Sequence, residues 1–447
     1  MPGRHILHVD ANAFYASVEM QENLTLRGKR IAVCGSQEDR HGIVLTASYP
    51  AKRMGVKTGM AIWEAQQHCR DLIIVPPHYR EYMRYSGYMR EILQDYTDQI
   101  EAFGLDESWA DVSGSVGLFG SAMTIAREIS DRVKRELGIT VSIGVSDNKV
   151  TAKLGSDYKK PDAITRIEAD NYKEIVYPLP VQDLLYVGHA TQRKLNYYGI
   201  RTIGQLAQTN PETLHGWFGK VGYSLSAFAR GLDASPVAKQ HHVAAVKSVG
   251  NSGTTPRDLV NNEDVWLMLL VMAESVAMRM RELNMKCTVV EVSVRDSDLN
   301  GFVRQRKIEA PTSSSLEIAQ VAFDLFKATT AGASHCVVSG CAAPRWCPPI
   351  RRCSWAFSAM LRSARNWSGW TRRWMWCAND TGTPASSGRE CTPTAGWGPS
   401  IQRMTTRFTR WDFLTQDNAL YKIQEVRHGV TQDHRTGKKV CGSRCPF

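Results

Sequence analysis

Three acidic residues stand where they could hold metal ions. Asp10 ends the apolar segment "RHILHVD" and shortly precedes the aromatic pair Phe14-Tyr15, while Asp106 and Glu107 lie in "LDES", at an expected turn between two strands. A turn lets adjacent carboxylates reach one site, and three carboxylates from two loops suit a pair of Mg²⁺ ions about 3.5–4 Å apart. Such a pair activates an attacking hydroxyl and neutralises a leaving pyrophosphate. Spacing alone leaves a solvated turn as the alternative.

Alternating strands and helices are expected around these carboxylates. Apolar runs bounded by Gly turns predict strands at "RHILHVD", "RIAVCG", "GIVLTASY" and "TVSIGVSDN". Apolar spacing of three and four predicts helices at "YREYMRYSGYMREILQDYTDQI", "AMTIAREISDRVKREL" and "KVTAKLGSDYKK". Residues 1–165 should therefore form a mixed α/β unit whose strands meet in a largely antiparallel sheet.

Five ordered motifs carry a family resemblance. The segments "VDANAFYASVE", "ASYPAKRMGVKTGM", "GLDESWADV", "VSIGVSDNKVTAKLGSDYKKPD" and "LPVQDLLYVGHATQRKL" resemble successive motifs of the Y-family translesion DNA polymerases. The chain is most similar to the DNA polymerase IV (DinB/UmuC) branch, collinearly from residue 5 to about residue 330. The resemblance implies a template-directed, low-fidelity DNA polymerase acting in DNA repair and damage tolerance. The alternative is a non-catalytic family member that binds DNA as an accessory to another polymerase.

The resemblance also implies an α+β, multidomain right-hand architecture. It has a palm with a mixed or antiparallel sheet, small fingers, a helical thumb with a helix–hairpin–helix, and an α/β little finger. The expected domains are the palm at 1–20 and 76–165, the fingers at 21–75, the thumb at 166–240, a truncated little finger at 241–333, and a tail at 334–447.

The catalytic residues that the resemblance implies are the three carboxylates. Asp10, Asp106 and Glu107 would hold two Mg²⁺ ions, helped by the backbone carbonyl of Ala11. Asn12 stands where many relatives have a second Asp, and we do not count it as a ligand.

The substrate is expected to be a deoxynucleoside triphosphate. Tyr15 matches the steric gate, an aromatic that lies under the incoming sugar and collides with a 2′-hydroxyl, while Phe14 is expected in the core. Tyr49 and one of the adjacent cations Lys52 and Arg53 would contact the triphosphate; relatives carry Arg where Lys52 stands. Lys160 matches the palm lysine that reaches the β- and γ-phosphates.

Primer–template DNA is the second expected partner. Val187 and Gly188 match the thumb hairpin that holds the DNA backbone, although Tyr186 replaces its usual first glycine. In the little finger, which lays a sheet on DNA, the candidate phosphate contacts are Arg295, Arg304 and Arg306. Each arginine has the alternative of being an ordinary exposed strand residue.

The tail differs in composition from the rest of the chain. Residues 334–447 contain 17 of the 55 Lys and Arg but only 6 of the 44 Asp and Glu, so the tail alone accounts for the net charge of +11. It also contains 8 of the 11 cysteines and 8 of the 12 tryptophans, without paired CxxC spacing for zinc. DNA affinity in the body must therefore come from local patches rather than from net charge.

Such a composition is expected when GC-rich DNA is read out of frame. Reading "MTTRFTRWDFLTQ" from the third nucleotide of its first codon can spell DDTIHPVGFLDA, which resembles the ending of Gram-positive relatives. The same offset through "SWAFSAMLRSARNWSGWTRRWMWC" can give the amphipathic segment LGFFGDAAKREKLERLDAAVDVV, and just upstream it can give PVQL. The joined stretch PVQLGFFGD resembles a sliding-clamp-binding peptide. We therefore predict a frameshift near residues 330–336, a disordered tail, a little finger that lacks a strand, and no clamp-binding peptide in the expressed frame. The alternative is a lineage-specific extension.

The location and assembly of the chain are further expectations. No apolar run approaches the ~18 residues of a membrane span, and "MPGRHILHVD" has no signal-peptide pattern. We expect a cytoplasmic monomer that does not bind membranes.

Overall fold

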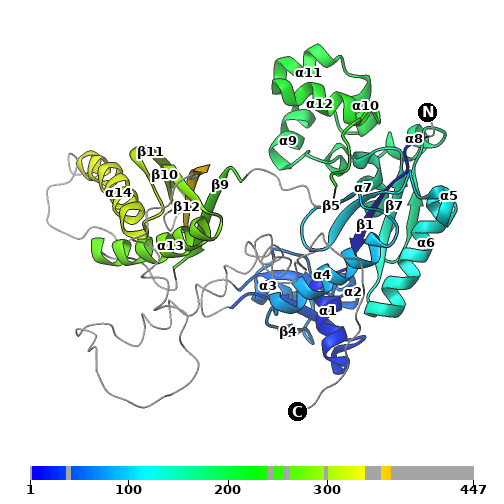
Figure 1. The fold of residues 1–447 in the computed structure, drawn as a ribbon, viewed down its shortest axis with the longest axis horizontal. Helices are drawn as coiled ribbons and strands as arrows, with labels where there is room; N and C mark the ends of the chain where they lie inside the picture. The colour runs from blue at the N-terminus through cyan, green and yellow to red at the C-terminus, as the bar shows by residue number, and fades with distance from the viewer. Residues whose placement is uncertain are drawn as a thin grey trace, which may run out of the picture. The chain divides into compact units, whose positions relative to one another are not determined.

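The computed structural model describes residues 3–36, 42–239, 246–255, 259, 261–295, 301–337 and 354–363. It has two compact units, Met1–Ala245 and Val246–Phe447 (Figure 1). In the described part of the chain, no helix has the length and hydropathy needed to cross a membrane.

The first unit is built on a five-stranded sheet in the order β5-β6-β1-β7-β8. Strand β1 is central and pairs antiparallel with both β6 and β7, whereas β7 and β8 are parallel. These strands are β1 (Ile6–Ala11), β5 (Ile100–Ala102), β6 (Glu107–Asp111), β7 (Val141–Ser146) and β8 (Ile164–Arg166). The predicted α+β class and mixed sheet are therefore confirmed.

Helices cover both faces of this sheet. Leu7 and Val9 point into the main core, which also receives side chains from α1 (Phe14–Glu22), α4 (Tyr79–Gln94) and α6 (Ala122–Arg132). Ile6, His8 and Asp10 alternate with these residues along β1 and face α7 (Lys149–Tyr158). Gly144 lets α7 lie close to the sheet, since a Cβ there would stand only 1.8 Å from the Ala152 carbonyl oxygen. This second face carries the acidic end of β1.

Two smaller parts complete the first unit. A three-stranded sheet in the order β3-β2-β4 packs with α2 and α3 around its own apolar cluster. Its elements are β2 (Ile31–Cys34), β3 (Val44–Ala47), α2 (Tyr49–Arg53), α3 (Ile62–His68) and β4 (Ile73–Val75). A helical part follows the sheet strands, with α8 (Tyr172–Val176), α9 (His189–Tyr197), α10 (Ile203–Gln208), α11 (Pro211–Phe218) and α12 (Lys220–Ala229). The short helix α5 spans Val116–Phe119.

The second unit is a sheet covered on one face by two helices. The strand order is β11-β10-β12-β9, and the helices α13 (Asn262–Glu282) and α14 (Ser315–Val337) bury the inward side chains of β10 (Figure 1). The strands are β9 (Ser248–Thr254), β10 (Met285–Arg295), β11 (Gly301–Thr312) and β12 (Ser354–Ser363).

Strand β12 corrects the expectation of a little finger that lacks a strand. It lies between β10 and β9 and pairs antiparallel with both, so the sheet has four strands. The ladder is made by backbone groups, and "SWAFSAMLRS" has the alternating apolar pattern that a strand tolerates. The predicted tail disorder lies outside the described residues from 364 onward.

Candidate active site

The three predicted carboxylates come from neighbouring backbone positions. Asp10 at the end of β1 is directly opposite Glu107, the first residue of β6. The next backbone N–H, that of Ala11, donates to the carbonyl oxygen of Asp106 at 2.9 Å. The antiparallel pairing of β1 and β6 thus brings together the two acidic motifs that are about a hundred residues apart in sequence.

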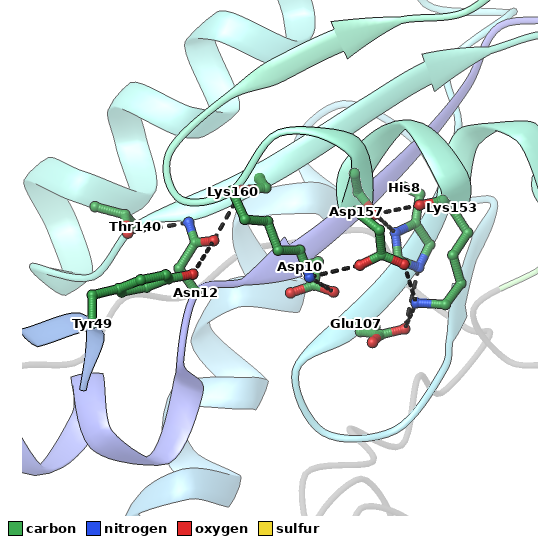
Figure 2. A network of polar contacts seen from close by, with 11 residues as sticks. His8, Asp10, Asn12, Tyr49, Glu107, Thr140, Lys153, Asp157 and Lys160 are labelled. Atoms are coloured by element: carbon green, nitrogen blue, oxygen red, sulfur yellow. Dashed lines mark hydrogen bonds and ion pairs between the residues drawn. The ribbon is translucent and has the colours of Figure 1, made fainter. Parts of the chain in front are cut away.

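Two lysines occupy carboxylate oxygens of this site (Figure 2). Lys160 Nζ lies 2.7 Å from Asp10 Oδ2, and Lys153 Nζ lies 2.6 Å from Glu107 Oε2. Asp157, on the same helix as Lys153, contacts both lysines at 2.8 and 3.5 Å. Lys160 was predicted as a site residue, whereas Lys153 was not. Lys153 lies one helical turn after Lys149 on α7 and faces β6, which only the folded structure shows.

Burial sets the electrostatics of the acids. It raises the pKa of Asp10, an effect that Lys160 opposes. The pKa of Asp106 is also raised, first by burial and then by the charge of Glu107. Burial acts in the same direction on Glu107, but contacts with His8 and Lys153 outweigh it and hold the pKa of that carboxyl low. The site therefore has more negative charge than its surroundings stabilise, and it favours a cation.

His8 is a site residue that sequence reasoning missed. It is fully buried, with Nδ1 2.8 Å from Ser156 Oγ and Nε2 3.4 Å from Glu107 Oε2. Burial lowers the pKa of the imidazole, so the ring is neutral at pH 7. The only signal in the sequence was a polar residue in an apolar strand, two positions before Asp10 and thus on the same face.

The side chain of Asn12 is committed to protein contacts. Its Oδ1 accepts from Ser142 Oγ at 2.9 Å and from the Tyr49 hydroxyl at 3.3 Å, while Nδ2 donates to Thr140 Oγ1 at 3.2 Å. Figure 2 shows the amide between Tyr49 and Thr140. These contacts agree with leaving Asn12 out of the ligand set, and they orient Tyr49.

The predicted triphosphate contacts lie on α2. Lys52 Nζ lies over the Tyr49 ring, 4.8 Å from its centroid. Burial and the neighbouring charge of Lys160 lower the pKa of Lys52. Lys52 and Arg53 are both exposed, but successive residues of a helix point about 100° apart. Lys52, rather than Arg53, therefore faces the side of Tyr49 and Lys160.

The predicted sugar gate lies on α1. Tyr15 is half-buried and stacks on Tyr82, with ring centroids 4.2 Å apart and an interplanar angle of 11°. Phe14 is 2% exposed and belongs to the main core, as expected from its neighbouring position. Burial raises the pKa of Tyr15 to about 12, so the phenol stays neutral at physiological pH.

The acidic site fits divalent metal ions. In the described part of the chain, no three acidic, histidine or cysteine side chains form a ready metal cluster. The ammonium groups of Lys160 and Lys153 contact carboxylate oxygens of Asp10 and Glu107. The donors are nevertheless hard carboxylate oxygens, the type that Mg²⁺ prefers. The lysines already show that this partly buried site binds positive charge.

The predicted thumb contacts lie before α9. Val187 is 7% exposed, and its side chain belongs to the apolar cluster of the helical part. Gly188 caps α9, and a Cβ built there would meet no atom within 4 Å, so another molecule could approach its backbone. Tyr186 has φ of 69°, a left-handed conformation that is uncommon for residues other than glycine. Its ring is 62% exposed.

The three little-finger arginines are exposed, but they do not share one face of the sheet. Arg304 and Arg306 pair with the buried residues Val292 and Val290, so they lie on the helix-covered face. Arg306 also approaches Asp324 of α14 at 3.6 Å. Arg295 lies on the opposite face, and by the same register so does Lys307, which sequence reasoning missed.

Comparisons with family models agree with this architecture. Residues 9–157 match the impB/mucB/samB family, and residues 246–360 match the C-terminal domain of that family. Residues 182–233 match the thumb domain described for DNA polymerase-iota. The C-terminal match extends to residue 360, which includes most of β12.

Individual proteins give the same result. The chain is 52% identical over 323 residues to DNA polymerase IV of Acetivibrio thermocellus, covering 72% of this chain and 81% of the relative. It is 37% identical to DNA polymerase IV 1 of Bacillus subtilis, covering 73% and 79%. A solved Y-family DNA polymerase chimera of Dbh and Dpo4 superimposes with a TM-score of 0.68 at 25% identity, covering 80% of this chain and 99% of the chimera. The chain therefore belongs to the impB/mucB/samB family, within the DNA polymerase IV branch of the Y-family DNA polymerases.

Proposed function

We propose that this chain is a translesion DNA polymerase that adds deoxynucleotides to a primer 3′ end on a DNA template, with low fidelity. The observation that carries the proposal is the backbone pairing of β1 with β6, which brings Asp10, Asp106 and Glu107 to neighbouring positions. The family and the DNA polymerase IV relatives support DNA-directed DNA polymerase activity. They do not favour the alternative of a non-catalytic accessory that only binds DNA.

The carboxylates would hold two Mg²⁺ ions. Asp10, Asp106 and Glu107 are the proposed ligands, with the backbone carbonyl of Ala11 as a fourth donor. When bound, the ions supply activation of the primer hydroxyl and neutralise charge on the leaving pyrophosphate. His8 would help to orient the Glu107 carboxylate, because His8 Nε2 lies 3.4 Å from Glu107 Oε2. Lys160 would release Asp10 and bind the β- and γ-phosphates.

The nucleotide would lie between α1 and α2. Tyr49 and Lys52 would contact the triphosphate, with Tyr49 oriented by Asn12 and with Arg53 in a minor role. Tyr15 would lie under the sugar and exclude a 2′-hydroxyl. The short fingers, 21–75, leave little protein to test the shape of the nascent base pair, which is consistent with low fidelity.

DNA would be held through its backbone. The hairpin at Val187 and Gly188 presents main-chain groups at the start of α9, a position suited to phosphate. In the little finger we assign the main role to Arg295 and Lys307, on the sheet face opposite α13 and α14. Arg304 and Arg306 would contribute only at the sheet edge.

Primer extension tests the proposal. Purified chain, a primer–template with a recessed 3′ end, Mg²⁺ and the four deoxynucleoside triphosphates should give stepwise extension directed by the template. The accessory alternative predicts primer–template binding without any extension. That outcome, with intact binding measured by fluorescence anisotropy, would overturn the proposal.

We also propose that the tail is translated from a shifted frame beginning near residues 330–336. The match to the Acetivibrio relative covers 72% of this chain and 81% of the relative, so part of each chain lies outside the match. The presence of β12 does not decide the matter, because strand pairing uses backbone groups. The nucleotide sequence tests it directly: one alternative frame must encode DDTIHPVGFLDA and PVQLGFFGD. If neither frame encodes them, the tail is an extension of this lineage and a sliding clamp would need another contact.

A further inference from the structure

The ring of Tyr15 is enclosed by aromatic neighbours from the start of α4. Tyr82 stacks against it in parallel at 4.2 Å, and Tyr79 meets it edge-on at 6.0 Å and 85°. Tyr79 also meets Tyr82 edge-on at 5.7 Å. The position of Tyr15 is therefore set largely by the position of the Tyr82 ring, which is fully buried.

A buried carboxylate holds Tyr82 in turn. The Tyr82 hydroxyl donates to Glu19 Oε1 and accepts from the backbone N–H of His78 at 3.1 Å. Glu19 is 6% exposed, and both of its carboxylate oxygens also contact His78 Nδ1, at 2.9 and 3.0 Å. Since Glu19 lies one helical turn after Tyr15 on α1, the carboxylate joins the gate helix to the helix that carries the stacking ring.

This arrangement exceeds what core packing needs. A phenylalanine would stack on Tyr15 equally well without a hydroxyl, and burying a carboxylate costs free energy unless its contacts offset it. What the hydrogen bonds add is a fixed in-plane position for the Tyr82 ring. A gate that separates two sugars by one oxygen atom needs such a fixed ring, because a small displacement would admit the 2′-hydroxyl.

We propose that Glu19 is a positioning residue for sugar selection, acting through the Tyr82 hydroxyl on the stacked ring of Tyr15. The inference rests on the proposed polymerase function and on Tyr15 as the gate. Neither Glu19 nor Tyr82 contacts the nucleotide in this scheme. Their substitution should change the choice between deoxyribonucleotides and ribonucleotides more than it changes the rate with deoxyribonucleotides.

The same two helices provide a matched control. The Tyr85 hydroxyl donates to Glu22 Oε1 at 2.8 Å, so a second tyrosine–glutamate hydrogen bond joins α1 and α4 one turn farther along. Unlike Glu19, Glu22 is exposed and also pairs with Arg84 at 2.9 Å. Tyr85 is 8% exposed, and its ring lies near that of Tyr88, with the two ring centroids 6.3 Å apart. The control pair therefore joins the helices without touching the gate.

The experiment compares Tyr82→Phe and Glu19→Gln with Tyr85→Phe and Glu22→Gln. Single-nucleotide incorporation is measured with a deoxyribonucleotide and with the matching ribonucleotide, and thermal unfolding is followed for each variant. We expect the ribonucleotide-to-deoxyribonucleotide ratio of kcat/KM to rise about 3- to 10-fold in Tyr82→Phe and somewhat less in Glu19→Gln, the range for loss of one hydrogen bond. The control pair should stay within about 1.5-fold, and the unfolding data show how much each variant loses in stability.

Two further variants make the result decisive. The double variant of Glu19→Gln with Tyr82→Phe should match Tyr82→Phe alone, because both substitutions act on the same Tyr82–Glu19 hydrogen bond. Tyr15→Ala tests the gate itself. If Tyr15→Ala raises ribonucleotide use but the Glu19 and Tyr82 variants behave like the controls, the positioning role is overturned while the proposed function stands. If Tyr15→Ala has no effect, the assignment of the gate fails first.

Discussion

The two units hold their candidate site residues in different ways. In the first unit the residues around β1 have short, specific contacts, such as Asp10 with Lys160 at 2.7 Å and Tyr15 with Tyr82 at 4.2 Å. In the second unit the candidate DNA contacts Arg295 and Lys307 are exposed on strands. The first arrangement fixes geometry around one reacting centre, whereas the second presents charge over a surface.

This difference predicts how each unit responds to substitution. A preorganised centre works through a few interactions in a poorly solvated site, so the loss of one has a large effect. Phosphate contacts in water are individually weak, roughly additive and screened by salt. Single substitutions should therefore be severe in the first unit and mild in the second.

The largest effect should follow Asp106→Ala. Loss of a proposed metal ligand should lower the rate of primer extension by at least about 10³-fold, since metal charge stabilisation contributes several kcal/mol. Binding of primer–template, measured by anisotropy, should persist. Asp157→Asn is the control. Asp157 contacts Lys153 and Lys160, the lysines that pair with the proposed ligands Glu107 and Asp10, but it is not itself a proposed ligand. Retained extension by Asp106→Ala would remove it from the site.

The second effect concerns the sugar and Tyr15. Tyr15→Ala removes the ring under the 2′ position, so the discrimination against ribonucleotides should fall by about 10- to 100-fold, the range expected for one group in a shaped pocket. Incorporation with deoxyribonucleotides should fall much less. Competition between the two nucleotides at one template base measures the ratio, and an unchanged ratio would place the gate elsewhere.

The sequence indicated candidate site residues more readily than the contacts that position them. Asp10 and the pair Asp106-Glu107 follow from strand ends and turns, which are local patterns. The partner of Tyr82 could not be predicted, because Glu19 lies 63 residues earlier and only the packing of α1 on α4 brings them together. The same holds for Lys153, whose contact with Glu107 depends on α7 lying against the sheet.

The tail shows the opposite error. Its composition suggested that no strand would form after α14, yet β12 fills the position between β10 and β9. A strand needs only about ten residues and an available ladder, so a short alternating segment can pair even where the surrounding composition is unusual. Composition averaged over the 114 residues of 334–447 could not reveal such a segment.

A third, moderate effect should separate Lys52 from Arg53. Lys52→Ala should raise the KM for the incoming deoxynucleoside triphosphate about 10-fold or more, the cost of one charged hydrogen bond. Arg53→Ala should change it less than about 2-fold, because Lys52 faces Tyr49 and Lys160 whereas the next residue on α2 points about 100° away. Lys52→Arg should keep or improve the KM, since a guanidinium can bind phosphate through two hydrogen bonds. A larger effect of Arg53→Ala than of Lys52→Ala would reverse the assignment.

The smallest effect should be found on the second unit. Arg295→Ala and Lys307→Ala should each weaken primer–template binding by only about 3- to 10-fold at low salt, and each should reduce the slope of log affinity against log salt by about one, as the loss of one phosphate contact requires. Arg306→Ala is the matched control, because it removes the same charge from the helix-covered face of the sheet, where Arg306 already approaches Asp324 at 3.6 Å. Its slope should not change. If all three variants shift the slope equally, net charge rather than the uncovered face governs binding; a loss above about 100-fold from one arginine would show a fixed contact, and the contrast between the two units would no longer hold.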